Sequence, residues 1–275
     1  MIVSTHGIVA SGITNYVGLL DIYTGATVAY SLRKLSTAYT GYAVRVRRSS
    51  DNTSQDIGFV NNVLDTASLL SFVGGGNGFV SVWYDQSGNG HDLSQTTSSN
   101  QPYIVGGGVI YTVNGKANII TDGSSFLYNS TCSVNGTTNS IFSTLTLTPI
   151  RAVMAMSSYN NSFGQLFPSR NSSGNNRYYD SLTDITASPL NSGLNLLSFH
   201  ENSLGITVYE NNSLLTANYT HDTTNGNGLF LFKRDAGNGL NSNCGINEYI
   251  IYSGLSKLSD NSNISTNINS YYSIY

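Results

Sequence analysis

Residues 83–93 carry the clearest structural signal of this chain and read Trp83-Tyr84-Asp85-Gln86-Ser87-Gly88-Asn89-Gly90-His91-Asp92-Leu93. A strand with an aromatic end runs directly into a group of turn-forming residues. Asp and Asn side chains hydrogen-bond to nearby backbone in turns, and glycine adopts positive φ without steric cost. The stretch therefore predicts a tightly built loop at the mouth of one β-strand, framed by Asp85 and Asp92.

A second motif precedes this loop and reads Arg45-Val46-Arg47-Arg48-Ser49-Ser50-Asp51. Together with Tyr42 and Val44, its apolar residues alternate with arginines, which is the period-2 pattern of a half-buried strand. The two motifs resemble the catalytic-domain family of α-L-arabinofuranosidase B. The resemblance covers most of the chain from about Ala29, including Gln101-Pro102 and a closing segment over 245–275. Residues 125–240 match the family only in general character.

This resemblance implies one fold and two kinds of function. The fold is a concanavalin-like β-sandwich. The function is either hydrolysis of arabinofuranosides or a structural role, because the domain is also similar to a recurrent scaffold module of bacteriophage virion proteins. Enzymes of the family carry two adjacent cysteines that form a strained disulfide against the sugar, whereas Cys132 and Cys244 of this chain are far apart in sequence. We map no family nucleophile onto this sequence.

The remaining sequence predicts short strands and two helices. Apolar residues from Val60 to Leu70 follow a helical period and predict one amphipathic helix of about three turns, ended by glycines at 74–76. Apolar residues within Ser256–Tyr275 predict a closing helix. Strands are expected over residues 117–121, 141–147, 151–157, 194–200, 205–210, 228–232 and 246–252, with Asn211-Asn212 as a hairpin turn.

These elements predict an all-β fold, a concanavalin- or laminin-G-like jelly-roll β-sandwich with one short helix and a C-terminal helix. A single domain is expected over residues 29–275. Residues 1–28 are rich in Gly, Thr and Val and show no amphipathic period. They form either a leader that serves as an arm or anchor, or a first strand of the sandwich.

The composition argues against several classes of function. Only 10% of the 275 residues are charged and the net charge is −3, so a basic surface for nucleic acid or an anionic membrane is not expected. No apolar run is long enough to span a bilayer. Residues Met1–Gly7 lack the basic and apolar regions of a secretory signal. We therefore expect Cys132 and Cys244 as reduced thiols, with a disulfide between them as the alternative.

A retaining glycosidase needs two carboxyl groups about 5–5.5 Å apart, and this chain offers few candidates. Glu248 lies in an apolar strand, where a buried carboxylate needs a partner. We predict a structural ion pair between Glu248 and Arg47, with Arg45 or Arg48 as alternative partners. Asp235 is a candidate acid or base by its loop position alone. The sequence therefore assigns no catalytic residue.

Several loop residues are suited to binding a sugar. Asp85 and Asn89 offer carboxylate and amide groups to a glycan or a cation, and the alternative is that they cap their own turn. Tyr178, Tyr179 and Tyr219 stand among Asn and Ser, and tyrosine joins a stacking surface to a hydroxyl group. The alternative for these tyrosines is that they cover strand edges. The histidines are scattered without metal-ligand spacing, and we expect neither a metal nor a cofactor.

The sequence favours a bacteriophage virion structural protein: a capsid decoration, head fibre, spike or tail-associated subunit. Its expected partners are other virion proteins, further copies of this chain in a symmetric homo-oligomer, and a host surface glycan. Its expected location is the virion, assembled in the host cytoplasm. The alternatives are an arabinofuranosidase-like glycoside hydrolase and a free carbohydrate-binding module.

Overall fold

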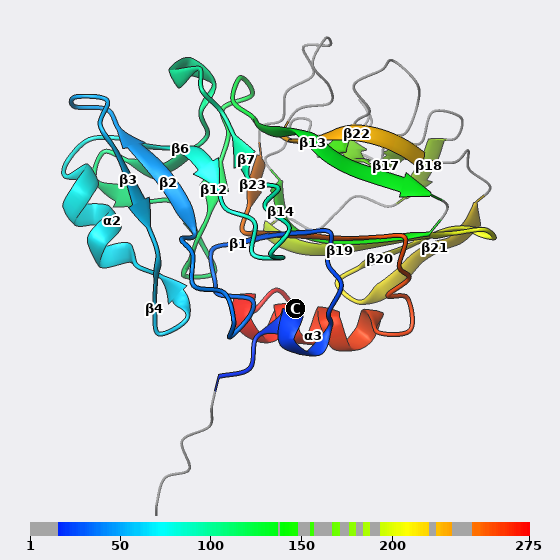
Figure 1. The fold of residues 1–275 in the computed structure, drawn as a ribbon. Coiled ribbons are helices and arrows are strands. Elements are labelled where there is room, and N and C mark those ends of the chain that lie inside the picture. The colour runs from blue at the N-terminus through cyan, green and yellow to red at the C-terminus, as the bar shows by residue number, and fades with distance from the viewer. Residues whose placement is uncertain are drawn as a thin grey trace, which may run out of the picture.

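The computed structural model describes residues 16–136, 138–147, 155–156, 167–170, 176–179, 184–187, 193–219, 224–232 and 244–275. Within these ranges the chain is mostly antiparallel β-structure in two layers, with β13 and β22 over β14 and β19 (Figure 1). The predicted all-β sandwich is therefore confirmed. Many of the predicted short strands are present, because their alternating or continuous apolar patterns match one or two buried faces.

The lower layer is one antiparallel sheet whose strands follow each other by main-chain pairing. Its order is β1 (Val28–Ser31), β24 (Glu248–Ser253), β14 (Asn139–Leu147), β19 (Gly193–Asn202), β20 (Gly205–Glu210) and β21 (Ser213–Tyr219). Asn211 and Asn212 join β20 to β21 with φ of 50° and 63°. This is the predicted hairpin turn, and asparagine suits it because it tolerates positive φ.

The upper layer continues into the lobe that carries the two sequence motifs (Figure 1). Its order is β3 (Ser54–Ile57), β2 (Val44–Arg48), β6 (Gly78–Trp83), β7 (Leu93–Ser94), β13 (Leu127–Gly136), β22 (Thr224–Leu231) and β15 (Ala155–Met156). Three strands connect this layer to the lower sheet: β8 (Tyr103–Gly106), β12 (Ile119–Ile120) and β23 (Cys244–Ile246).

The remaining elements are small. They are β4 (Phe59–Val60) with β5 (Val63–Leu64), β9 (Val109–Ile110) beside β8, β10 (Thr112–Val113) with β11 (Lys116–Ala117), the three strands β16 (Phe167–Arg170), β17 (Asn176–Tyr179) and β18 (Asp184–Ala187), the helices α1 (Leu19–Ile22), α2 (Thr66–Val73) and α3 (Asn261–Tyr272), and a 3₁₀ turn over Ser98–Asn100.

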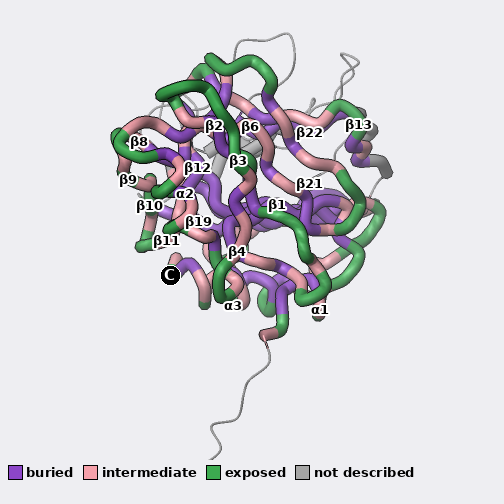
Figure 2. The backbone as a smooth tube through the Cα atoms, turned by 60° about the vertical axis from the view of Figure 1, so that its left-hand side comes forward, coloured by how far each residue is buried: buried purple, intermediate pink, exposed green. Residues whose placement is uncertain are grey.

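Strand β24 is buried on both faces. Tyr249 and Ile251 point into the main core between the layers. Ile250 and Tyr252 point into a second core, which lies between the lower sheet and the helices α1 and α3. Figure 2 shows the tube buried along the interior and exposed mainly in the loops. Because successive side chains of a strand alternate between faces, two cores require an unbroken apolar run, and Tyr249–Tyr252 supplies it.

One prediction about local structure is corrected. The expected helix over Val60–Leu70 is instead the hairpin β4–β5 followed by α2, because Asn61 and Asn62 take φ of 51° and 64° and reverse the chain. Asp65 then caps α2 by accepting from the Ser68 amide at 3.0 Å. A helical period of apolar residues also arises when a tight hairpin precedes a short helix.

The predicted leader, residues 1–28, is partly built into the domain. Leu19 and Leu20 are buried in the second core, and a side chain at Gly18 would collide with the Leu35 carbonyl. Residues 16–28 therefore pack on the sandwich. Residues 1–15 lie outside the described part of the chain, and their role as an arm or anchor stays a prediction.

The closing helix α3 confirms the prediction for the tail and is fixed at its first residue. Asn261 lies 2.9 Å from Nε2 of the buried His200 through its side-chain oxygen, and Ser140 Oγ lies 2.8 Å from His200 Nδ1. Burial lowers the pKa of His200, which outweighs the opposing effect of the Asn261 hydrogen bond. The folded state therefore favours the neutral imidazole.

We predict that this histidine makes the domain less stable in mild acid. The unfolded chain binds a proton on His200 near its ordinary pKa of about 6.5, whereas the folded chain binds it only at lower pH. The free energy of unfolding is thus highest above that value and falls as pH drops from 7.5 to 5.5. Urea unfolding at both pH values should show a smaller fall for His200→Gln, and an equal fall would contradict this assignment.

Candidate functional site

The loop after β6 holds the edge strand β1 with its side chains. Asp85 is 4% exposed, and its Oδ1 accepts from the backbone amides of Ala29 and Ser87, both at 2.9 Å. Its Oδ2 accepts from Ser87 Oγ at 2.7 Å and from the His91 amide at 3.1 Å. Both oxygens are saturated by groups of the protein. Asp85 is therefore not available to a glycan, which corrects the sequence prediction for this residue.

The neighbouring residues of the loop continue the same role. Gln86 donates from Nε2 to the carbonyls of Ser31 and Arg33, both at 3.0 Å, and accepts from the Leu35 amide at 2.8 Å. Asn89 donates from Nδ2 to two further carbonyls, Ala26 and Thr27, each at 3.0 Å. The side chains thus replace the missing neighbour strand along residues 26–35. The Asn89 amide nitrogen is committed to the fold, so a sugar contact by that group is not supported.

Loop geometry explains why the motif needs its glycines. Gly88 and Gly90 take φ of 89° and 74°, values that other residues rarely adopt. Asp92 closes the loop by accepting from the Asp85 amide at 2.8 Å. Burial raises the pKa of Asp92, and the nearby Asp85 charge adds to this rise. The two carboxylates are neighbours in a folding motif, with Asp85 enclosed.

Glu248 sits in the core at the start of β24 and is 1% exposed. Arg33 binds it in a bidentate pair, with Nε 2.7 Å from Oε2 and Nη2 2.9 Å from Oε1. Ser31 Oγ donates to Oε2 at 2.8 Å, and the Tyr272 hydroxyl lies 3.3 Å from the same oxygen. Burial alone would lower the pKa of Arg33. The charge and hydrogen bonds of Glu248 outweigh this effect, so the Arg33 pKa is raised. The pair joins β24 to the segment after β1.

The predicted Glu248–Arg47 ion pair is wrong. Arg47 lies in β2 of the other layer, where its Nε donates to Gln101 Oε1 at 2.7 Å and its guanidinium stacks 4.4 Å from the Phe79 ring centre. The sequence prediction considered only the arginines of the alternating strand pattern at 44–48. Arg33 lies after the short strand β1 and outside any such pattern. It lies close to β24 because Ser31, two residues earlier, pairs with Glu248.

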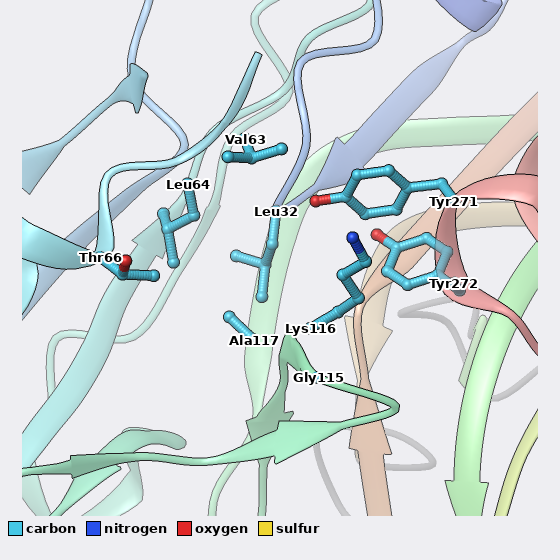
Figure 3. A pocket seen from close by; sticks show the side chains of 9 residues that line it. All are labelled: Leu32, Val63, Leu64, Thr66, Gly115, Lys116, Ala117, Tyr271 and Tyr272. Carbon is cyan, nitrogen blue, oxygen red and sulfur yellow. The ribbon is translucent and has the colours of Figure 1, made fainter. Parts of the chain in front are cut away.

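A pocket of about 210 Å³ lies next to this ion pair, between the end of α3 and the β10–β11 hairpin (Figure 3). One wall is aliphatic and is formed by Leu32, Val63 and Leu64. The opposite wall carries Tyr271 and Lys116, whose ammonium lies 4.2 Å from the Tyr271 ring centre. None of the described residues that line this pocket is a carboxylate, so they do not supply the acid pair that glycoside cleavage requires.

Other predicted residues fall where their side chains are not described. Tyr178 and Tyr179 belong to β17 and Tyr219 to β21, but their side chains lie outside the described part. Asp235 lies outside the described residues. Glycan binding by the three tyrosines and the acid or base role of Asp235 stay predictions. Both cysteines are free thiols buried in the core, and burial raises the pKa of Cys132 to about 12, which keeps it protonated and unreactive.

The acidic residues whose side chains the structure describes all have partners in the fold. Apart from Asp85 and Glu248, Glu201 accepts from Asn139 at 2.7 Å in the core, and the others serve turns, caps or ion pairs. These others are Asp21, Asp51, Asp56, Asp65, Asp92, Asp122 and Asp260. Glu210 also has an interaction partner in the fold. Among the described residues no cluster of His, Cys, Asp and Glu could hold a metal ion, and no described helix is long and apolar enough to cross a membrane.

Comparison with known proteins shows which proteins this chain is similar to. The family model described as "Alpha-L-arabinofuranosidase B, catalytic" matches residues 20–129, which contain both motifs and the ion-pair residue Arg33. The chain carries a domain similar to that catalytic domain. A probable α-L-arabinofuranosidase B of Aspergillus flavus is 38% identical over 96 residues, 32% of this chain and 19% of that protein. The α-L-arabinofuranosidase B of Aspergillus oryzae matches with the same identity and coverage.

The likeness in fold extends well beyond the matched sequence. A GH54 α-L-arabinofuranosidase soaked with a cyclic sulfate inhibitor has a TM-score of 0.74 at 16% identity, covering 92% of this chain and 65% of the other. An arabinofuranosidase complexed with arabinofuranosyl-α-1,2-xylobiose has a TM-score of 0.73 at 17% identity, covering 92% and 64%. This chain therefore shares the sandwich of these enzymes but spans less than two thirds of their length.

We predict that Asp85→Asn destabilises the domain by about 2–3 kcal/mol, because an amide nitrogen would face donors now bound by Oδ2 and the charge on the loop is lost. Urea unfolding measures the change. Asp122→Asn is the matched control, since Asp122 caps an exposed turn through Ser124, and it should cost less than about 1 kcal/mol. Equal effects would mean that the loop does not hold β1.

Glu248→Gln should cost about 3–5 kcal/mol or abolish folding, because it leaves Arg33 buried without a counter-ion. The control is Asp56→Asn, which breaks the exposed Arg45–Asp56 pair and should cost about 1 kcal/mol or less. Thermal and urea unfolding give both values. A Glu248→Gln protein with unchanged stability would refute the structural role of the pair.

Proposed function

We propose that this chain is an arabinofuranosidase-like glycoside hydrolase domain that acts on α-L-arabinofuranosides. The observation that carries the proposal is the family match over residues 20–129, which includes the β1-holding loop and Arg33. The likeness in fold over 92% of the chain supports it further. These features are the shared scaffold, and the chemistry depends on where two carboxyl groups meet a sugar.

The acid and the nucleophile are proposed from the aspartates whose side chains are not described. The described carboxylates accept hydrogen bonds in turns, helix caps and strands, or pair with Arg and Lys side chains. The sequence contains four other acidic residues, Asp180, Asp184, Asp222 and Asp235. We assign the catalytic pair to two of these four, one as nucleophile and one as acid and base of a retaining reaction. Asp235 was already a candidate by its loop position.

The experiment is release of 4-nitrophenol from 4-nitrophenyl α-L-arabinofuranoside by the full chain. Single Asp→Asn variants at the four positions should include two whose kcat falls by about 10²–10⁴ or more, the range of acid–base and nucleophilic groups. Asp122→Asn should keep full activity. A wild-type chain that is folded but inactive, or four active variants, would refute the hydrolase proposal.

A second candidate is a structural subunit of a bacteriophage virion, with other virion proteins and further copies of this chain as partners and a host glycan as a weak ligand. It is favoured by the absence of the adjacent cysteine pair from the sequence and by the commitment of the described carboxylates to folding. Antibody labelling of purified particles tests it. Regular label on heads or tails supports it, and label confined to free protein in the lysate refutes it.

A further inference from the structure

A hollow of about 500 Å³ lies on the lobe that carries β2 and β3, between the segment 34–42 and the β4–β5 hairpin. In Figure 1 β4 marks its place at the lower end of this lobe, on the side away from β13 and β22. The hollow shares no lining residue with the pocket at Tyr271, and none of the residues predicted to bind a glycan lines it. It is called the β4 groove below.

Three aromatic rings line the β4 groove, and contacts within the chain hold them in place. Tyr42 is 50% exposed and its ring lies 6.1 Å from that of Tyr84. Tyr39 donates from its hydroxyl to the Tyr42 carbonyl at 2.8 Å and meets the Phe59 ring edge-on at 6.3 Å. Rigid, half-exposed aromatic faces are the surfaces that stack on the C–H faces of sugar rings at low entropic cost.

Amide groups and glycines complete the groove. Asn61 and Asn62 form the positive-φ turn between β4 and β5, and the Asn62 carbonyl accepts from the Lys34 amide at 2.9 Å, which fixes the turn against the opposite wall. Asparagine amides supply donors and acceptors for sugar hydroxyls. Gly58 has no side chain to fill the space, and a Cβ there would meet only Tyr42, at 3.6 Å.

The described residues that line the groove favour one class of ligand. None of them is acidic, and one is a cation, Lys34, whose Nζ donates to the Thr37 carbonyl at 3.3 Å. An anionic ligand would meet a single ammonium, whereas a neutral sugar would meet three rings and two amides. We propose that the β4 groove is a binding subsite for neutral oligosaccharide.

Arabinoxylan is the probe, and this choice rests on the proposed function. The assay measures binding to the polysaccharide and does not depend on its cleavage. The full chain is run through native gels that contain arabinoxylan, and its retardation gives an apparent affinity. Tyr42→Ala removes an exposed stacking face, and Gly58→Leu fills the groove without altering a positive-φ position. Each variant should lower the affinity about tenfold, the size expected for one stacked aromatic contact.

Tyr275→Ala is the matched control, because Tyr275 is 52% exposed and lies at the C-terminus outside the groove. It should be retarded like the wild type. All three variants should cleave 4-nitrophenyl α-L-arabinofuranoside at the wild-type rate, so the result separates the groove from the catalytic proposal. A wild-type chain that is not retarded, or groove variants retarded as strongly as the wild type, would overturn the proposal whether or not the chain is a hydrolase.

Discussion

The bidentate pair between Arg33 and Glu248 joins the first strand, the last strand and the closing helix of the sandwich. It lies where β1, β24 and α3 meet, and both charges are out of water. A buried pair adds little net stability over an apolar substitute, but each partner makes the other indispensable. Ser31 and Tyr272 hydrogen-bond to the same carboxylate, so this one group fixes the first strand, the last strand and the closing helix relative to one another. The loop at Asp85–Asn89 then holds β1 from its other side.

This arrangement separates the scaffold of the domain from its chemistry. The loop motif contacts the backbone of residues 26–35, and Arg47 of the strand motif binds Gln101 and Asn52. Their presence therefore predicts the sandwich in both enzymes and structural proteins. The proposed hydrolase would need carboxylates other than these, which is why Asp180, Asp184, Asp222 and Asp235 are the proposed catalytic residues. The β4 groove would bind neutral polysaccharide whether or not the chain is catalytically active.

Much of the fold could be predicted from local patterns. The strand over Val44–Arg48, the asparagine hairpin at 211–212 and the closing helix each follow from period or turn chemistry. The helix expected over Val60–Leu70 could not be distinguished from a hairpin and a helix, because both place apolar residues at similar spacing. The partner of Glu248 was missed because pairing across 215 residues is set by sheet topology, which strand periodicity does not encode. The sequence left Asp85 open between a sugar contact and a turn cap, because a loop carboxylate has the same sequence pattern in both roles, and the structure shows the cap.

The most direct test of the central claim is peptide mapping by mass spectrometry after incubation with an arabinofuranose-configured cyclic sulfate, the inhibitor class soaked into one of the similar structures. A retaining enzyme forms a covalent bond to such a reagent through its nucleophile. We predict a single adduct on Asp180, Asp184, Asp222 or Asp235, and none on Asp122. An adduct on Asp85 or Glu248 would contradict the structural roles given to them, and a folded chain that forms no adduct would contradict the assignment as a hydrolase.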